Sequence, residues 1–168
     1  MKRIFAIRTV LAIALLAMAV TIFLFSAQAG KDSSSSSSAV VGIVRGIFVP
    51  HFDSLTPAEQ EQINYTLTVI VRKGAHMTEY AALAALALLN CMAWNLPRKY
   101  PFKLCASLAF SAIYATSDEI HQLFVPGRAG LFTDVLVDCG GALIGLGVVT
   151  VAVFAIRRAK NKKKHGSA

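Results

Sequence analysis

The chain has 168 residues, 55% of them hydrophobic, and its mean hydropathy of +0.58 excludes an ordinary soluble domain. Its apolar residues fall in long runs, which is typical of membrane-spanning helices. The formal net charge is +8, and such basic clusters could serve a nucleic-acid binder. Here they flank the apolar runs, so the positive-inside rule explains them first and we expect no nucleic-acid partner.

Twelve of the 17 basic residues gather in three places, at the N-terminus, around residue 100 and in the C-terminal tail. The twelve are Lys2, Arg3, Arg8, Arg98, Lys99, Lys103, Arg157, Arg158, Lys160, Lys162, Lys163 and Lys164. All nine acidic residues lie elsewhere. A chain of this length predicts one membrane domain over residues 1–168, with its core at residues 4–156. Cys91, Cys105 and Cys139 form no disulfide or zinc spacing, so we interpret them as small hydrophobic residues.

The first apolar run covers residues 4–25 and is interrupted only by Arg8, whose side chain can reach the interface. About twenty apolar residues are needed to cross a bilayer, so this run predicts span one. A cleaved secretory signal is the alternative, because residues 27–29 read Ala-Gln-Ala, a cleavage pattern. The apolar stretch is longer than a usual signal core, which favours a retained helix.

A serine run at residues 31–38 predicts a flexible spacer, because serine repeats bury no apolar surface. It belongs to a predicted extracytoplasmic, serine-rich loop at residues 30–55. The apolar part of this loop has few charges and is expected along the outer membrane surface. Its sequence leaves a short helix and a strand equally open.

Thr56, Pro57 and Glu59 predict the start of a helix, with a capping box and a proline in the first turn. No strong stop signal follows before Pro97, although Gly74 could introduce a kink. Span two is therefore expected to begin near residue 67 or 74 and to end at residue 94.

Span three is predicted at residues 102–117 and a loop at residues 121–130, where Pro126-Gly127 signals a turn. Span four is predicted at residues 134–156, followed by a basic cytoplasmic tail at residues 157–168. Gly141 and Gly145 are four residues apart and predict close helix packing, within the chain in preference to a dimer contact.

The predicted fold is therefore all-α, an integral membrane protein with four transmembrane helices. Four spans place both termini on one side, and the basic clusters make that side cytoplasmic. The acidic residues then fall on or near the outer side, together with His76, His121 and Arg128.

Polar side chains gather where three predicted helices meet the outer boundary. Lys73, His76 and Tyr80 share one helix face, and Arg72, His76 and Glu79 share an overlapping one. Charged side chains in a bilayer cost free energy, so these groups should point inward and pair. The cluster is either a salt-bridge network that locks the helices or a site open to the outer leaflet, and we favour the site. Its members are Arg72, Lys73, His76, Glu79, Tyr80, Asp118, Glu119, His121, Gln122, Arg128, Asp134 and Asp138.

His76 and Glu79 are the candidates for acid–base catalysis, since an imidazole beside a carboxylate can move protons. No nucleophile stands out: Ser117 fits a helix cap or a hydroxyl bonded to its own backbone. His76 with Glu79 and Glu119 with His121 resemble metal ligands by type, but the spacing is weak. We therefore expect no metal and no cofactor.

Three segments of the chain resemble the VanZ-like bacterial membrane proteins. Residues 73–80 match the family's K-x-x-H-x-x-E-Y segment, residues 118–128 its D-E-x-H-Q-x-F-x-P-G-R segment, and residues 134–141 its D-x-x-x-D-x-x-G segment. Residues 25–28, Phe-Ser-Ala-Gln, also look like the polar end of that family's first helix. The resemblance covers nearly the whole chain but does not extend to the serine run or the basic tail.

The resemblance implies a multi-pass protein of the bacterial plasma membrane, in a family whose founding member gives low-level teicoplanin resistance. We expect a non-enzymatic protein whose partners are membrane lipids and a lipid-linked cell-wall precursor or lipophilic glycopeptide. The alternatives are an intramembrane enzyme that modifies a lipid head group through His76 and Glu79, and a purely structural cluster in a scaffold protein. The sequence leaves the oligomeric state open.

Overall fold

The computed structural model describes residues 2–28 and 30–165, which contain helices and no strand. The all-α prediction is therefore confirmed for this part of the chain. The helices are α1 (Lys2–Ser26), α2 (Gly30–Phe48), the short 3-10 helix η1 (Phe52–Ser54), α3 (Pro57–Trp94), α4 (Tyr100–Gln122) and α5 (Phe132–His165).

Both ends of α3 are defined by local capping interactions. Thr56 Oγ1 accepts a hydrogen bond from the Glu59 backbone N–H, and Glu59 Oε2 accepts one from the Thr56 N–H at 2.9 Å. This is the predicted capping box, with Pro57 in the first turn. At the other end Asn95 takes a left-handed conformation with φ of 55°. Asparagine tolerates that conformation, so the helix ends where the sequence predicts.

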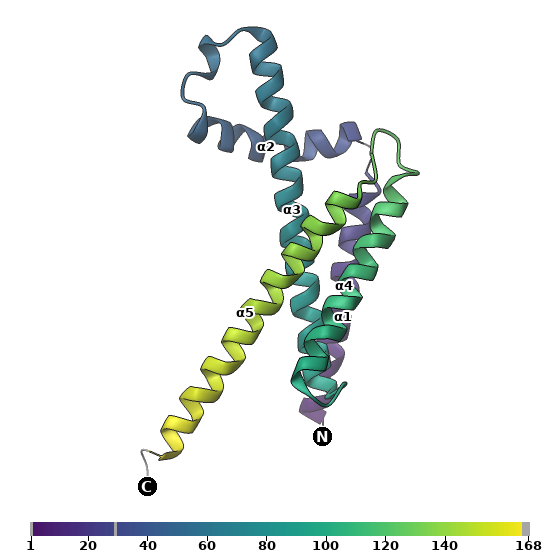
Figure 1. Cartoon of the computed structure of the whole chain (residues 1–168), viewed down its shortest axis with the longest axis vertical. Coiled ribbons are helices and arrows are strands. Elements are labelled where there is room, and N and C mark those ends of the chain that lie inside the picture. Colours follow the sequence, from purple (N-terminus) through teal and green to yellow (C-terminus); the bar gives the residue numbers. More distant parts are fainter. Residues whose placement is uncertain (1, 29, 166–168) are drawn as a thin grey trace.

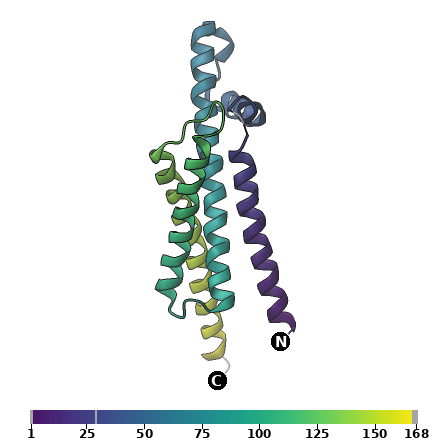
Figure 2. The same cartoon turned by 90° about the vertical axis from the view of Figure 1, so that its right-hand side faces the viewer.

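Helix α3 is the centre of the bundle and contacts each of the other four α-helices. Figures 1 and 2 show α1, α3 and α4 running side by side, while α5 packs against α3 and slants away from the other helices toward its C-terminal end. The start of α1 and the end of α5 lie at the same, lower end. We call the opposite end, where α2 lies, the upper end. At this upper end α3 extends beyond the other helices, and α2 lies across α3 (Figure 1).

The contact between α3 and α5 is close because glycines face the neighbouring backbone. A Cβ atom on Gly141 would lie 2.2 Å from the Met77 carbonyl oxygen, and one on Gly145 would lie 2.0 Å from that of Ala81. Any side chain would force the two helices apart. The glycine pair therefore packs within one chain, as the sequence analysis favoured.

Three helices are long and apolar enough to cross a membrane: α1, α3 and residues Phe132–Lys162 of α5. Many large apolar side chains point away from the bundle, among them Phe5, Leu16 and Val151. Such a surface suits contact with lipid rather than water. Helix α4 was expected to be a span as well, but it carries Lys103, Asp118 and Glu119 and is less apolar.

The serine run differs from its prediction. A flexible spacer was expected at residues 31–38, but the backbone is helical from Gly30 to Phe48. Serine costs a helix only a few tenths of a kcal/mol per residue relative to alanine, and the apolar half of α2 packs Val41 against the rest of the molecule. The choice between helix and strand after the serines is thereby resolved as helix. Likewise, α5 continues through most of the basic tail to His165.

Candidate functional site

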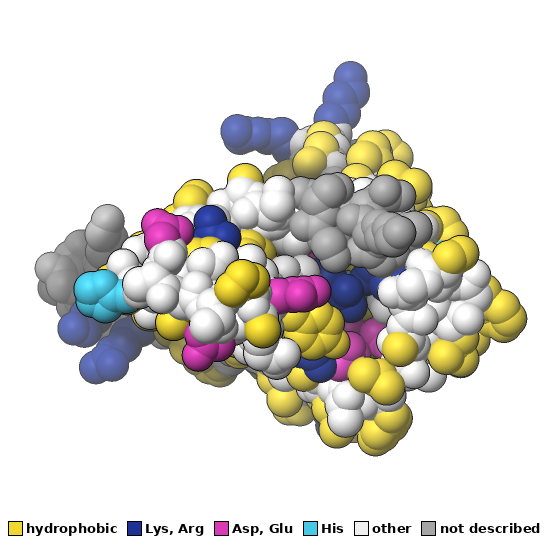
Figure 3. Space-filling model, turned by 90° about the horizontal axis from the view of Figure 1, so that it is seen from above, with side chains coloured by type: hydrophobic (Ala, Val, Ile, Leu, Met, Phe, Trp, Pro, Cys, Tyr) yellow, Lys and Arg dark blue, Asp and Glu magenta, His cyan; other side chains and the backbone are white. Residues whose placement is uncertain are grey.

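The predicted polar residues meet at the upper end of the bundle, where α3, α4 and the start of α5 approach one another. Seen from above, acidic and basic side chains gather in a central hollow of this end (Figure 3). They come from the middle of α3, the end of α4, the loop after it and the first turns of α5.

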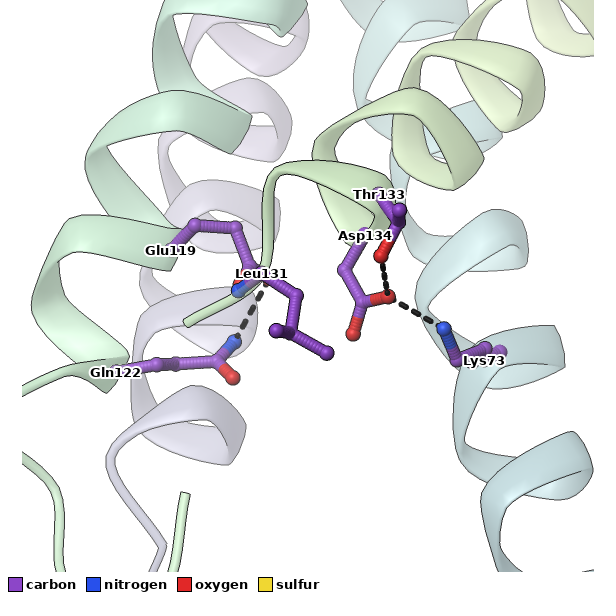
Figure 4. Close-up of polar contacts among 6 residues, drawn as sticks. All are labelled: Lys73, Glu119, Gln122, Leu131, Thr133 and Asp134. Atoms are coloured by element: carbon purple, nitrogen blue, oxygen red, sulfur yellow. Dashed lines mark hydrogen bonds and ion pairs between the residues drawn. The ribbon is translucent and has the colours of Figure 1, made fainter. Parts of the chain in front are cut away.

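One ion pair joins α3 to α5. Lys73 Nζ contacts Asp134 Oδ1, and the Thr133 hydroxyl lies 3.4 Å from the same carboxylate oxygen (Figure 4). The Lys73 side chain is 39% exposed and that of Asp134 is 21% exposed. The pair thus lies at the rim of the hollow and links the two helices where α5 begins.

A second group of contacts holds the loop at residues 123–131 against α4. Glu119 Oε2 accepts a hydrogen bond from the Leu131 N–H at 2.8 Å, and Gln122 Nε2 lies 3.4 Å from Glu119 Oε1 and 3.3 Å from Asp118 Oδ2. Figure 4 shows Gln122 and Glu119 side by side on α4, next to Leu131. All three polar side chains are buried. Glu119 therefore holds the loop, while Asp118 and Gln122 make their contacts within α4.

Arg128 ties the same loop to the end of α1. Its Nε donates to the Gln28 carbonyl at 3.1 Å and its Nη2 to the Phe25 carbonyl at 3.0 Å. Burial lowers the pKa of Arg128 from its ordinary value, but a guanidinium stays charged in proteins. The positive charge of Arg128 is thus fixed in place by carbonyl dipoles and not by a carboxylate.

Four of the predicted site residues line one open cleft of about 210 Å³. Apolar residues, together with Gln28 and Ser37, complete the wall. The lining residues are Phe25, Gln28, Ser37, Val40, Val71, Arg72, Ala75, His76, Glu79 and Arg128. The predicted shared face of Arg72, His76 and Glu79 is therefore confirmed.

Two buried nitrogen atoms on cleft-lining residues make no hydrogen bond to the described part of the chain. They are His76 Nδ1 and Arg128 Nη1. The Arg72 side chain likewise makes no hydrogen bond or ion pair among the described residues. Buried polar groups are normally hydrogen-bonded, so the unused guanidinium donors beside the cleft favour a ligand with acceptor oxygens.

A second hollow of about 10 Å³ lies behind the cleft. Arg72 and His76 line both hollows. The other lining residues are Lys73, Glu119, Gln122, Asp134, Val137 and Asp138. This space holds at most about one water molecule, so it is no ligand pocket. Asp138 is only 1% exposed there.

Three predicted site residues lie outside both hollows. Tyr80 is fully buried in the core, with its ring 6.3 Å from that of Tyr114. His121 packs its ring 4.7 Å from that of Phe23 on α1. Asp118 contacts Gln122 within α4. The structure does not bring these three residues to the cleft. Within residues 2–28 and 30–165 no group of three His, Cys, Asp or Glu side chains is arranged for a metal ion.

The contributions of α1, α2 and the segment between them to the cleft were not predicted from the sequence. Phe25, Gln28, Ser37 and Val40 belong to its lining but not to the predicted set. The polar end of the first helix at residues 25–28 was a usable signal. Ser37 and Val40 offered none, because their segment was interpreted as a loop.

The sequence model of the VanZ/LLP1 family matches residues 11–154, which include all twelve predicted site residues and the whole cleft. The chain belongs to the VanZ/LLP1 family. Searches of curated proteins and of solved structures found no match. The VanZ/LLP1 match and the three apolar helices together identify a membrane protein.

Proposed function

We propose that this VanZ/LLP1 protein crosses the bacterial plasma membrane four times, through α1, α3, α4 and α5. Helix α1 would be retained, because Tyr114 OH donates to its Ala19 carbonyl and Ile22 belongs to the buried core. The lower end carries the basic clusters of the N-terminus, the α3–α4 turn and the tail, which supports a cytoplasmic position for both termini. The upper end would then face outward.

We further propose that the cleft binds the anionic head group of an amphiphile, such as a lipid-linked cell-wall precursor or a lipophilic glycopeptide. The observation that carries this proposal is the pair of unpartnered buried nitrogens, His76 Nδ1 and Arg128 Nη1, beside one cleft. The Arg128 nitrogen is a donor, and the His76 nitrogen donates in one of the two tautomers of the ring. Arg72 adds a second guanidinium to bind phosphate or carboxylate. Phe25, Val40 and Val71 supply apolar contacts for the adjoining chain. Low-level teicoplanin resistance is one role that such binding could serve.

A direct binding measurement tests the site. The full chain in phosphatidylcholine nanodiscs would be titrated with a fluorescent polyprenyl phosphate. Losing a hydrogen bond to a charged partner costs about 1.5–3 kcal/mol, so Arg72→Gln should weaken binding by about tenfold or more. Arg128→Gln should weaken it as well, but this variant also loses two backbone contacts. Arg98→Gln makes the same change at an exposed position of the lower end and should bind like the wild type.

Equal binding by Arg72→Gln and the wild type would contradict the proposed site. Chemical turnover of the probe, lost in Glu79→Gln, would instead favour the enzymatic alternative with His76 and Glu79.

A cellular assay tests the physiological role. The wild type and His76→Asn, Glu79→Gln and Arg128→Gln would be expressed in a susceptible Gram-positive host. Inhibitory concentrations of teicoplanin and vancomycin would be measured, with membrane levels checked by blot. Teicoplanin protection that disappears in variants that still accumulate would support binding at the cleft. No protection from a well-expressed wild type would separate this chain from resistance.

A further inference from the structure

The apolar half of α2, residues 39–48, has one polar side chain, and it points toward α3. This side chain is Arg45, whose Nη1 donates to Asn64 Oδ1 at 3.1 Å and whose guanidinium lies 4.3 Å from the centre of the Phe52 ring. Val41, nearly buried, faces the same way. The opposite side of this half-helix therefore holds apolar residues and glycine alone.

That opposite side forms a continuous apolar stripe. Val40, Ile43 and Ile47 follow i, i+3, i+7 spacing, so they share one side of the helix, and Phe48 closes its end. Ile43 is 65% exposed, Ile47 67% and Phe48 74%. In water such a stripe would leave large apolar side chains uncovered. A helix with an apolar face of this kind is suited to lie in the plane of a membrane interface.

The position of α2 matches that interface. Helix α2 begins four residues after α1 ends, and the last residues of α1, Phe23 to Phe25, are also exposed apolar side chains. The stripe therefore continues the lipid-facing surface of α1 around its upper end. Figure 1 shows α2 running across the bundle rather than along it. A helix that follows a spanning helix in this orientation lies at head-group depth.

The stripe also reaches the cleft. Val40 belongs to both, since it is half exposed and lines the cleft with Ser37. We propose that the apolar stripe of α2 binds the lipids of the outer leaflet, and that α2 forms the lipid-side wall of the cleft. An amphiphile then reaches Arg72 and Arg128 sideways from the membrane. This inference rests on the proposed function in that α1 crosses the membrane and the upper end faces outward.

Quenching of tryptophan fluorescence by brominated lipid tests whether the stripe contacts lipid, and it needs no ligand in the cleft. Single-tryptophan proteins would be made in a Trp94→Phe background and placed in vesicles of phosphatidylglycerol with brominated or ordinary acyl chains. Ile47→Trp should lose as much fluorescence to brominated lipid as Val20→Trp on the exposed side of α1. Glu61→Trp, in the exposed first turns of α3, should lose none.

An Ile47→Trp protein that behaves like Glu61→Trp would overturn the proposal. Protection from quenching together with chemical cross-linking into dimers would also overturn it, because a second copy would then cover the stripe. Quenching as expected, in a protein that fails to bind polyprenyl phosphate, would support the membrane-surface helix and refute the proposed ligand. The two proposals can therefore fail separately.

Discussion

Both ends of the bundle carry polar side chains, but the two ends use them differently. At the lower end Lys103 and Arg8 donate to backbone carbonyls of the protein itself. At the upper end, donors on Arg72, His76 and Arg128 remain unused among the described residues. A saturated donor stabilises the fold, whereas an unused one is available to another molecule, so we infer from this difference that the cleft residues are the ones open to a ligand.

Lys103 illustrates the lower end. It is only 6% exposed, and its Nζ donates to the Cys91 carbonyl and Asn95 Oδ1, each at 3.1 Å, and to the Pro97 carbonyl. It therefore caps the C-terminus of α3, where carbonyls lack helical partners. Arg8 donates to the Ala93 carbonyl at 3.0 Å and lies over the Trp94 ring. These residues join α1, α3 and α4 below the core.

The largest effect on folding is expected at the close contact between α3 and α5, because this contact holds the whole bundle together. Gly145→Leu should prevent folding, because a Cβ there would already lie 2.0 Å from the Ala81 carbonyl. Membrane accumulation and monodispersity on size exclusion would measure the loss. Gly147→Ala is the matched control, since a Cβ at Gly147 meets no atom within 4 Å. Normal accumulation of Gly145→Leu would show that α3 and α5 can separate.

A smaller effect is expected at the lower end. Lys103→Met should lower the free energy of unfolding by about 3 kcal/mol, because it leaves buried carbonyl acceptors without their charged donor. Denaturant unfolding in detergent micelles would measure it, with the exposed Lys99→Met as the control. The folded fraction should bind polyprenyl phosphate as the wild type does. Reduced affinity in that fraction would mean that the two ends are coupled.

The smallest effect is expected for the ion pair at the rim of the upper end. Lys73→Met should lower the free energy of unfolding by about 1 kcal/mol or less, because both side chains are partly exposed and solvent screens the pair. A double-mutant cycle with Asp134→Asn would isolate the interaction. Strictly additive effects would show that the pair contributes nothing to stability, and would place Lys73 among the groups available to a ligand.

Local signals in the sequence predicted much of the fold. The capping box at Thr56 and the turn at Pro126-Gly127 appear as expected, with Gly127 at a φ of 74°. The prediction failed at residues 31–38, where serine composition was interpreted as a spacer although the backbone is helical. The serine composition indicates only that this segment buries little apolar surface. The helix at residues 31–38 also depends on the packing of the apolar residues that follow it in α2.

Pairing within the site was harder to predict. The sequence offered Arg72, Lys73 and Arg128 as partners for five carboxylates, and in the described structure only Lys73 forms an ion pair. Arg128 bonds to the carbonyls of Gln28 and Phe25, which are 100 and 103 residues away, and no spacing rule indicates such contacts. A carbonyl is present at every residue, so only the folded arrangement shows which ones a guanidinium reaches.

The sequence by itself determined the all-helical class, the presence of helices long enough to span a membrane, the start of α3 and which polar residues share a helix face. These follow from periodicity and capping, which act over a few neighbouring residues. The tertiary structure decided which faces meet, through the approach of Gly141 and Gly145 to the α3 backbone. It also decided that α2 completes the cleft and that Tyr80 and His121 lie outside it, because contacts between distant segments depend on the packing of whole helices.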